Sequence, residues 1–219
     1  GMSLGAKTLL LPGLDHDPQA ERSRQERRRG LPASVITRLA AFGLLGASAG
    51  LMEDTGSTWG AIYLDRQFEV IPFVAGMAFV GLQGAQLIGR FTGDALVSRI
   101  GPRFAVVQGG IIAFLGMGLS LIWPSPTTAI LGFACVGWGV ATAIPSAMHA
   151  ADELPDMNHG DGLMVVTWMM RIGFFAGPPL IGALSEATDL RLALWVVPAF
   201  AVVILVLSPS LGRSVGGRR

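Results

Sequence analysis

The chain has 219 residues, of which 51% are hydrophobic and only 14% are charged, and its mean hydropathy is +0.55. These values exceed what a soluble domain normally carries and favour a protein embedded in a lipid bilayer. The 30 glycines and 13 prolines fit this class, because membrane helices use small residues for close packing and tolerate proline. The net charge of +1 is uninformative by itself, and the single Cys135 excludes a disulfide framework within the chain.

The first residues differ sharply from the rest of the chain. Residues 1–33 are polar and rich in Arg, as in RSRQERRRG at Arg22–Gly30, and they lack the apolar stretch of a signal peptide. We expect residues 1–33 to be a cytoplasmic linker, residues 34–212 a transmembrane domain, and residues 213–219 a cytoplasmic tail.

Six apolar runs follow. A hydrocarbon core about 30 Å thick needs roughly 20 mostly apolar residues in a helix, and runs of this kind are bounded by charges or proline. The sequence therefore predicts an all-α membrane protein with six transmembrane helices, at Ile36–Leu64, Pro72–Gly89, Phe104–Trp123, Thr127–Ala150, Leu163–Ser185 and Leu190–Leu211.

The basic residues predict the orientation of these helices. If the amino terminus is cytoplasmic, thirteen of the 16 Lys and Arg residues fall on the cytoplasmic face, whereas Arg66 and Arg191 fall on the other. Positively charged loops stay inside, so we expect both termini to be cytoplasmic. The acidic stretch Asp152–Asp161 is also assigned inside, although acidic residues carry little weight in this rule.

A charged, glycine-containing stretch, GRFTGDALVSRIGPR, joins the second and third runs. We interpret it as a cytoplasmic loop that resembles the signature loop of the major facilitator superfamily. The matching residues are Gly89, Asp94, Arg99, Gly101 and Arg103, and Arg90 belongs to the same expected gating loop. Pro102 stands where many members carry a basic residue.

Other segments resemble the second half of such a carrier. RIGFFAGPPLIGAL (Arg171–Leu184) resembles the penultimate helix, and MEDTGSTWGAIYL (Met52–Leu64) is similar to the seventh helix of bacterial sugar and drug permeases. The Arg-rich leader resembles the long central cytoplasmic loop. The resemblance implies one half of a twelve-helix bundle in the bacterial cytoplasmic membrane, with solute bound between two halves and moved by alternating access.

The resemblance has consequences for partners. We expect the chain to work with an amino-terminal six-helix half or a second copy, and a fragment or a split gene is the simplest account of the missing half. In the family the charged loop gates the carrier; the alternative is a loop that is merely positive inside. We expect a small-molecule substrate, no nucleic-acid partner and no cofactor.

Polar residues inside the apolar runs are the candidate site, because an ionisable group there costs about 2.5–3.5 kcal/mol on insertion scales. Arg171 lies roughly 12 Å into the fifth run, and Gln83, Gln86 and Thr142 fall at a similar depth. These four side chains would form a substrate-binding cluster. The alternative for Arg171 is a structural pairing between helices.

Two acidic residues, Glu53 and Asp54, lie late in the first run before Thr55, Gly56 and Ser57, which predict a broken helix. Glu53 is the candidate for accepting a coupling proton. The alternative is hydration at the outer interface, which we favour for Asp54.

Trp59 is a further substrate-binding candidate because its ring can stack on a sugar, although aromatic residues near a membrane surface more often form the interfacial belt. Pro178 and Pro179 should disturb the fifth helix. The glycine pairs Gly46 with Gly50, Gly89 with Gly93 and Gly173 with Gly177 should allow close helix packing.

The sequence gives weaker support to an enzyme or a metal-binding protein. GASAG, with Ser48, matches a hydrolase pattern but lies in an apolar run without a strand or turn, and His149 lacks metal-ligand spacing to a second ligand. We therefore expect neither an enzyme nor a metal site. The alternative to a transporter is a non-transporting membrane scaffold or accessory subunit built on the same half-fold.

Overall fold

The computed structural model describes residues 31–155, 157 and 160–213, and every regular element in them is helical. The predicted linker and tail lie almost wholly outside these residues. Among the described residues, six helical segments are long and apolar enough to cross a membrane, which confirms the predicted number of spans. The elements are α2 Ala33–Phe68, α3 Pro72–Ile100, α4 Pro102–Ile122, α5 Pro126–Ala141, α6 Ala143–Asp152, α7 Asp161–Ala187, α8 Leu190–Ala193, α9 Val196–Leu207 and the 3-10 helix η1 Ser208–Arg213.

The helix starts follow from local sequence. Proline occupies the first turn of α3, α4 and α5, where its missing N–H costs nothing. Ser125 and Thr128 form a reciprocal capping box at the start of α5, with each side chain bonded to the other residue's backbone N–H. Asp189 caps α8 through a 2.8 Å bond from the Leu192 N–H. Together, these caps fix where the chain turns at the ends of the spans.

Helix continuity differs from expectation at three places. The predicted break at Thr55–Ser57 is wrong, because α2 runs through it; the Ser57 hydroxyl donates to the Glu53 carbonyl at 2.9 Å and Gly56 packs on α3. The prolines do not interrupt α7 either. The fourth span does break, at Thr142, because Pro145 has no N–H to offer the Ala141 carbonyl.

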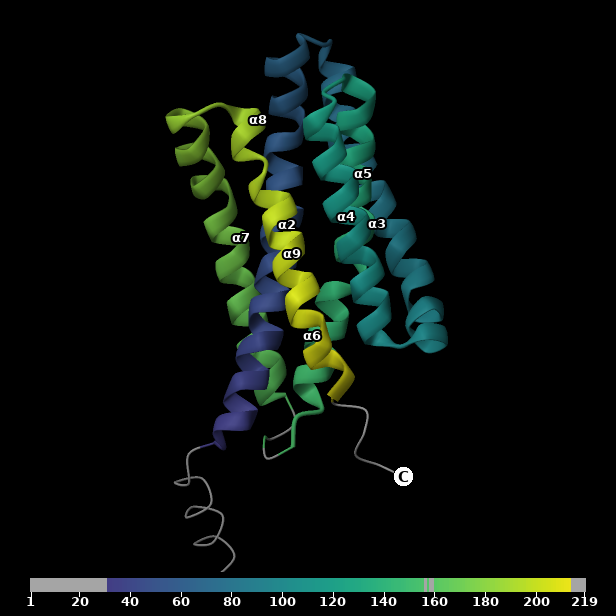
Figure 1. The fold of residues 1–219 in the computed structure, drawn as a ribbon, viewed down its shortest axis with the longest axis vertical. Helices are drawn as coiled ribbons and strands as arrows, with labels where there is room; N and C mark the ends of the chain where they lie inside the picture. The colour runs from purple at the N-terminus through teal and green to yellow at the C-terminus, as the bar shows by residue number, and fades with distance from the viewer. Residues whose placement is uncertain (1–30, 156, 158–159, 214–219) are drawn as a thin grey trace, which may run out of the picture. The chain divides into compact units, whose positions relative to one another are not determined.

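The helices form a bundle in which α2 lies between α7 on one side and α3 on the other (Figure 1). α5 packs against α3 and α4, and α9 packs against α4 and α2. The start of α2 and the end of η1 lie at the same end of the bundle, as an even number of spans requires (Figure 1).

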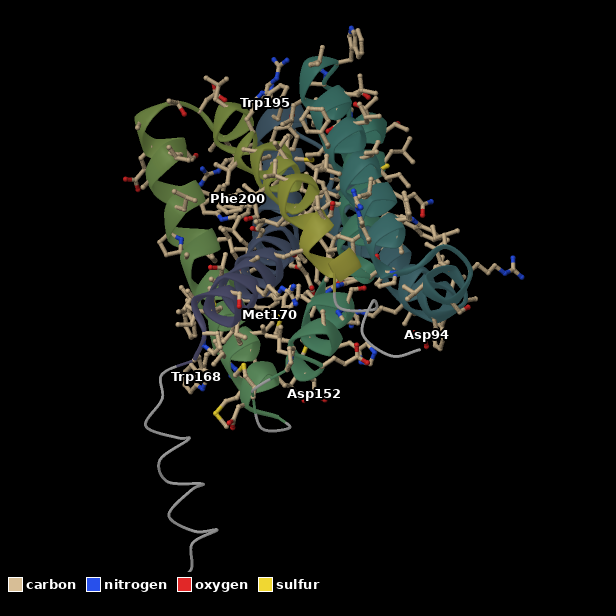
Figure 2. The ribbon with its side chains drawn as sticks, turned by 60° about the horizontal axis from the view of Figure 1, so that its bottom comes forward. Asp94, Asp152, Trp168, Met170, Trp195 and Phe200 are labelled. Carbon is tan, nitrogen blue, oxygen red and sulfur yellow. The ribbon has the colours of Figure 1, made fainter. Side chains whose placement is uncertain are left out.

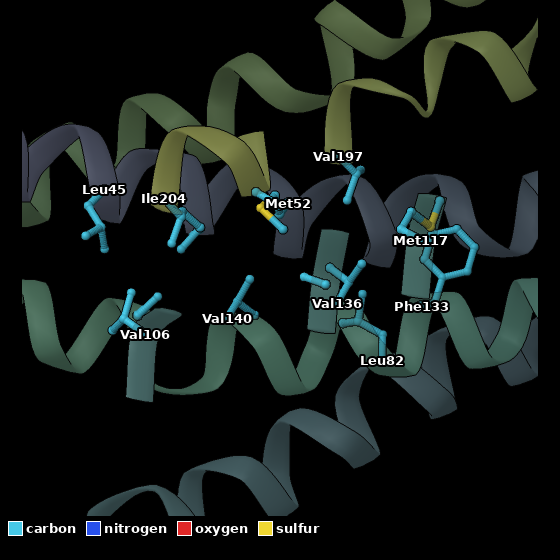
Figure 3. Close-up of a cluster of buried hydrophobic side chains, with 14 of the residues drawn as sticks. Leu45, Met52, Leu82, Val106, Met117, Phe133, Val136, Val140, Val197 and Ile204 are labelled. Atoms are coloured by element: carbon cyan, nitrogen blue, oxygen red, sulfur yellow. The ribbon is translucent and has the colours of Figure 1, made fainter. Parts of the chain in front are cut away.

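The apolar core lies where α2, α4, α5 and α9 meet (Figure 3). Glycines bring backbones into contact there: Gly137 faces the Leu82 carbonyl, and Gly109 faces Gly139. The fully buried side chains shown include Leu45, Met52, Leu82, Val106, Met117, Phe133, Val136, Val140, Val197 and Ile204. This packed centre holds α2 rigidly and so positions its polar residues.

Candidate functional site

An ion pair joins the middle of α2 to the middle of α3. Arg90 Nη2 lies 3.8 Å from Glu53 Oε2, and the Glu53 side chain is only 15% exposed whereas that of Arg90 is 54% exposed. Because α3 continues ten residues past Arg90, this guanidinium lies roughly 15 Å from the helix end rather than in a loop. The structure thus pairs the proposed proton acceptor with a residue assigned to the gating loop.

The register of α2 and α3 places Gln86 beside this pair. Gly60 faces Ala78 and Gly56 faces Leu82, so the next antiparallel turn sets Gln86 level with Met52 and Glu53. Gln86 is 3% exposed, and its Nε2 has no hydrogen-bond partner among the described residues. The register therefore places Gln86 on the part of α3 that is level with Glu53 of α2.

Buried polar atoms continue along α2. Within the described part of the chain, six buried side-chain atoms have no hydrogen-bond partner, and five of them belong to α2. Such atoms are costly in a low-dielectric interior and are expected to meet water, an ion or a ligand. They are Glu53 Oε2, Asp54 Oδ2, Thr55 Oγ1, Trp59 Nε1, Tyr63 Oη and, on α3, Gln86 Nε2.

Asp54, for which the sequence favoured hydration at the outer interface, is half-buried. Its Oδ2 is buried and faces Gly177 of α7. Trp59 is half-buried and turns toward α7, where its indole ring lies against Gly182. Tyr63, four residues after Trp59, also has a buried hydroxyl without a hydrogen-bond partner among the described residues.

Arg171 stands apart from the other predicted substrate residues. It is exposed on α7 and borders two shallow hollows of about 340 and 560 Å³. Gln83 and Gln86 belong to α3, on the other side of α2 (Figure 1), so the predicted cluster is not assembled within this chain. Thr142 is buried with its methyl group against Gly93 of α3, because the break before Pro145 turns it inward.

The predicted signature loop is mostly helix. α3 extends beyond Gly89 through Arg99 to Ile100, and only Gly101 turns, with a φ of 84° that favours glycine. Charged residues end an apolar run but do not end a helix, and for this reason the prediction of a loop at Gly89–Arg103 was wrong.

Within this segment the glycines and the charges separate. Gly89 and Gly93 face Ala141 and Thr142, which confirms their packing role. Asp94 is exposed, and Figure 2 shows it on the opposite side of the bundle from Trp168. Arg103 lies over the Phe104 ring at 5.8 Å. The charged side chains are thus presented outward, and the glycines hold α3 against the fourth span.

The α2–α7 seam confirms the remaining glycine pairs. Gly46 and Gly50 of α2 face Met170 of α7, while Gly173 faces the Ala47 carbonyl. Ser48 is buried and donates to the Leu44 carbonyl at 2.7 Å, and His149 is exposed beside Glu153 at 3.5 Å. In the part of the chain that the structure describes, no three His, Cys, Asp or Glu residues are grouped as metal ligands.

Comparison with known proteins agrees with this architecture. Residues 27–213 match the Major Facilitator Superfamily. The chain is 29% identical over 181 residues to the membrane protein MosC of Rhizobium meliloti and covers 44% of that protein, with 83% of the chain aligned. No solved structure matches.

Two further relatives are described as transporters. The chain is 29% identical to an uncharacterized transporter, y4wD, of Sinorhizobium fredii, with 79% of the chain and 46% of the relative aligned. It is 27% identical to an uncharacterized MFS-type transporter of Yersinia pestis, with 73% of the chain and 41% of the relative aligned. The chain thus spans less than half the length of these relatives. The match over most of its length shows that the chain belongs to the major facilitator superfamily.

Proposed function

We propose that the chain is the carboxy-terminal half of a secondary active transporter that moves a small solute by alternating access. The observation that carries this proposal is the row of buried, unpartnered polar atoms on α2 together with Gln86 of α3. A scaffold that only filled the membrane would gain stability from apolar side chains at these positions. A cavity that opens toward solute and water gives these atoms their partners.

Glu53 supplies the proton-coupling step of the proposal. Protonation removes its negative charge and so removes the attraction to Arg90, which loosens α2 from α3 at mid-span. Because Arg90 is half exposed, its freed guanidinium can meet water or an anionic solute group. The ion pair therefore links a proton to a helix contact, as a proton-coupled carrier requires.

Arg171 supports the need for a second half. Its side chain is exposed between the large apolar neighbours Trp168, Ile172 and Phe175, and a charged group at this depth is costly against lipid. A partner half covering this face of α7 would enclose Arg171 in the solute pathway, with Gln86 and Trp59 contributed from the centre. We propose an amino-terminal half or a second copy of the chain as that partner.

The proposed orientation has both termini in the cytoplasm. Among the described basic residues, Arg38 near the start of α2 and Arg99 and Arg103 beside Gly101 lie toward the end of the bundle where the chain enters, whereas Arg66 and Arg191 lie toward the other end. This distribution agrees with the positive-inside rule and assigns the Gly101 turn to the cytoplasmic side. We propose that the charged turn gates the carrier from that side.

Solute uptake into proteoliposomes tests the proposal. The preparations are the chain alone, the chain with an amino-terminal half from a full-length relative, and that pair carrying Arg171→Ala. Each is offered labelled sugars and labelled organic anions. Arg66→Ala is the matched control, since it removes an exposed Arg from the far end of α2. We expect uptake only by the pair, with loss on Arg171→Ala and retention on Arg66→Ala. Uptake by no preparation would favour the scaffold or accessory role.

A further inference from the structure

Three oxygen atoms of α2 converge on one point at Gly177 of α7. A methyl group at Gly177 would lie 3.4 Å from Thr55 Oγ1, 3.5 Å from Asp54 Oδ2 and 3.5 Å from the Leu51 carbonyl oxygen. The missing side chain of the glycine thus leaves a space about the size of a methyl group, walled by a carboxylate, a hydroxyl and a carbonyl. Hard cations take oxygen ligands of these kinds.

Two of these oxygens lack the partners that burial demands. Thr55 is 0% exposed and its hydroxyl has no hydrogen-bond partner within the described residues, although threonine in a helix commonly donates to the carbonyl one turn earlier. Asp54 Oδ2 is buried and equally unpartnered. Both atoms face the same space at Gly177, so one occupant could satisfy both.

The described charged side chains near Gly177 leave one negative charge, on Asp54, without an opposite charge beside it. Glu53 is balanced by Arg90, whereas nothing described is paired with Asp54. Arg171 lies six residues before Gly177, but it lies on the exposed face of α7 while Gly177 lies on the buried face. A single carboxylate is too little charge for Ca²⁺ or Mg²⁺, which favours a monovalent ion.

The sequence of α7 frees a carbonyl oxygen from helical bonding. Pro178 has no N–H, so the Phe174 carbonyl, one turn before Gly177, cannot accept its usual helical hydrogen bond. Carbonyls freed from helical bonding are the kind that coordinate Na⁺ in membrane transporters. The freed Phe174 carbonyl is therefore a chemically suitable group on the α7 side of the seam.

We propose that Asp54, Thr55 and the Leu51 carbonyl bind one Na⁺ in the space left by Gly177. The ion neutralises the half-buried Asp54 carboxylate and lies in the α2–α7 seam beside Gly177, and its release would leave that carboxylate uncompensated. The site is separate from the Glu53–Arg90 pair on the α3 side of α2. It adds a coupling ion to the transporter proposed above, but its binding can be measured without transport.

Direct binding of radioactive Na⁺ to the purified full chain in detergent, with choline as the balancing cation at pH 8, tests the site. Gly177→Ala is the central variant, because its methyl group fits at ordinary contact distances and fills the proposed site. Gly182→Ala is the matched control: it lies on the same helix and faces α2, and its methyl group would contact only the Trp59 ring at 3.6 and 3.8 Å. Asp54→Asn removes the charge without changing the shape.

We expect one Na⁺ per chain in the unaltered protein and in Gly182→Ala, and an affinity about tenfold weaker or worse in Gly177→Ala and Asp54→Asn. Absence of Na⁺ binding would overturn the proposal, as would equal binding in all variants. A tryptophan fluorescence change that follows pH but not Na⁺, and that is lost in Asp54→Asn, would assign the carboxylate to a proton instead and so also overturn the proposal. Retained Na⁺ binding without solute uptake would count against the proposed function alone.

Discussion

We predict that removing Arg90 from the Glu53–Arg90 ion pair destabilises the protein more than removing Glu53. At 3.8 Å two unit charges attract by about 4 kcal/mol in an effective dielectric of 20. The half-exposed Arg90 is screened by solvent, which reduces the net coupling to about 1–2 kcal/mol. Removing Arg90 leaves the mostly buried carboxylate of Glu53 without an opposite charge, whereas removing Glu53 leaves the guanidinium of Arg90, which water can reach. Arg90→Gln should therefore destabilise the protein by about 2 kcal/mol and Glu53→Gln by less than about 1 kcal/mol.

A double-mutant cycle measures this coupling. The unaltered chain, the two single variants and the double variant are unfolded in mixed micelles and followed by tryptophan fluorescence. We expect the double variant to be more stable than Arg90→Gln alone, because the stranded carboxylate is gone. Arg99→Gln, at the exposed end of α3, is the control and should change little. Strict additivity of the two single effects would refute the ion pair.

The remaining predictions concern helix packing. Gly137→Ala should lower the apparent melting temperature by several degrees, because its methyl group would overlap the Leu82 carbonyl. A methyl group at Gly84 meets nothing within 4 Å, so Gly84→Ala should raise the melting temperature slightly. Equal shifts in the two variants would contradict the packing. Arg191→Lys should destabilise the protein by about 1–2 kcal/mol in the same unfolding assay, because Arg191 bonds two carbonyls at the end of α4 at 2.8 and 3.3 Å. Pro145→Ala should slow amide exchange at residues 141–146 by joining α5 to α6, and unchanged exchange would show that proline does not cause the break.

The number and order of spans could be predicted because apolar length is a direct physical requirement of the bilayer. Their ends could not. Arg90, Asp94 and Arg99 end the apolar run, yet charged residues are compatible with a helix that projects beyond hydrocarbon, so α3 continued to Ile100. Pro145 broke its span, whereas Pro178 and Pro179 did not interrupt α7, which shows that proline alone does not determine continuity.

The candidate site was predicted in its parts but not in its arrangement. Glu53, Gln86 and Arg90 were each recognised as polar residues at unusual places, but their meeting depends on the antiparallel register of α2 and α3, which glycines at Gly56 and Gly60 set by close approach. Counting from the ends of the apolar runs predicts how deep these residues lie in the membrane. This prediction misplaced them, because the helices extend past those ends. The same error grouped Arg171 with side chains that belong to the other side of α2 (Figure 1).

The turn between α3 and α4 has a mechanical consequence. A single residue, Gly101, separates the two helices, so the connection contains no spare chain that could absorb a displacement of one helix end relative to the other. A displacement of the carboxy-terminal end of α3 must therefore also move the start of α4. α6 and α7, separated by residues 153–160, are not coupled in this way. A displacement of α3 is therefore passed on to α4 through their short turn, whereas the longer connection between α6 and α7 allows those helices to move more independently.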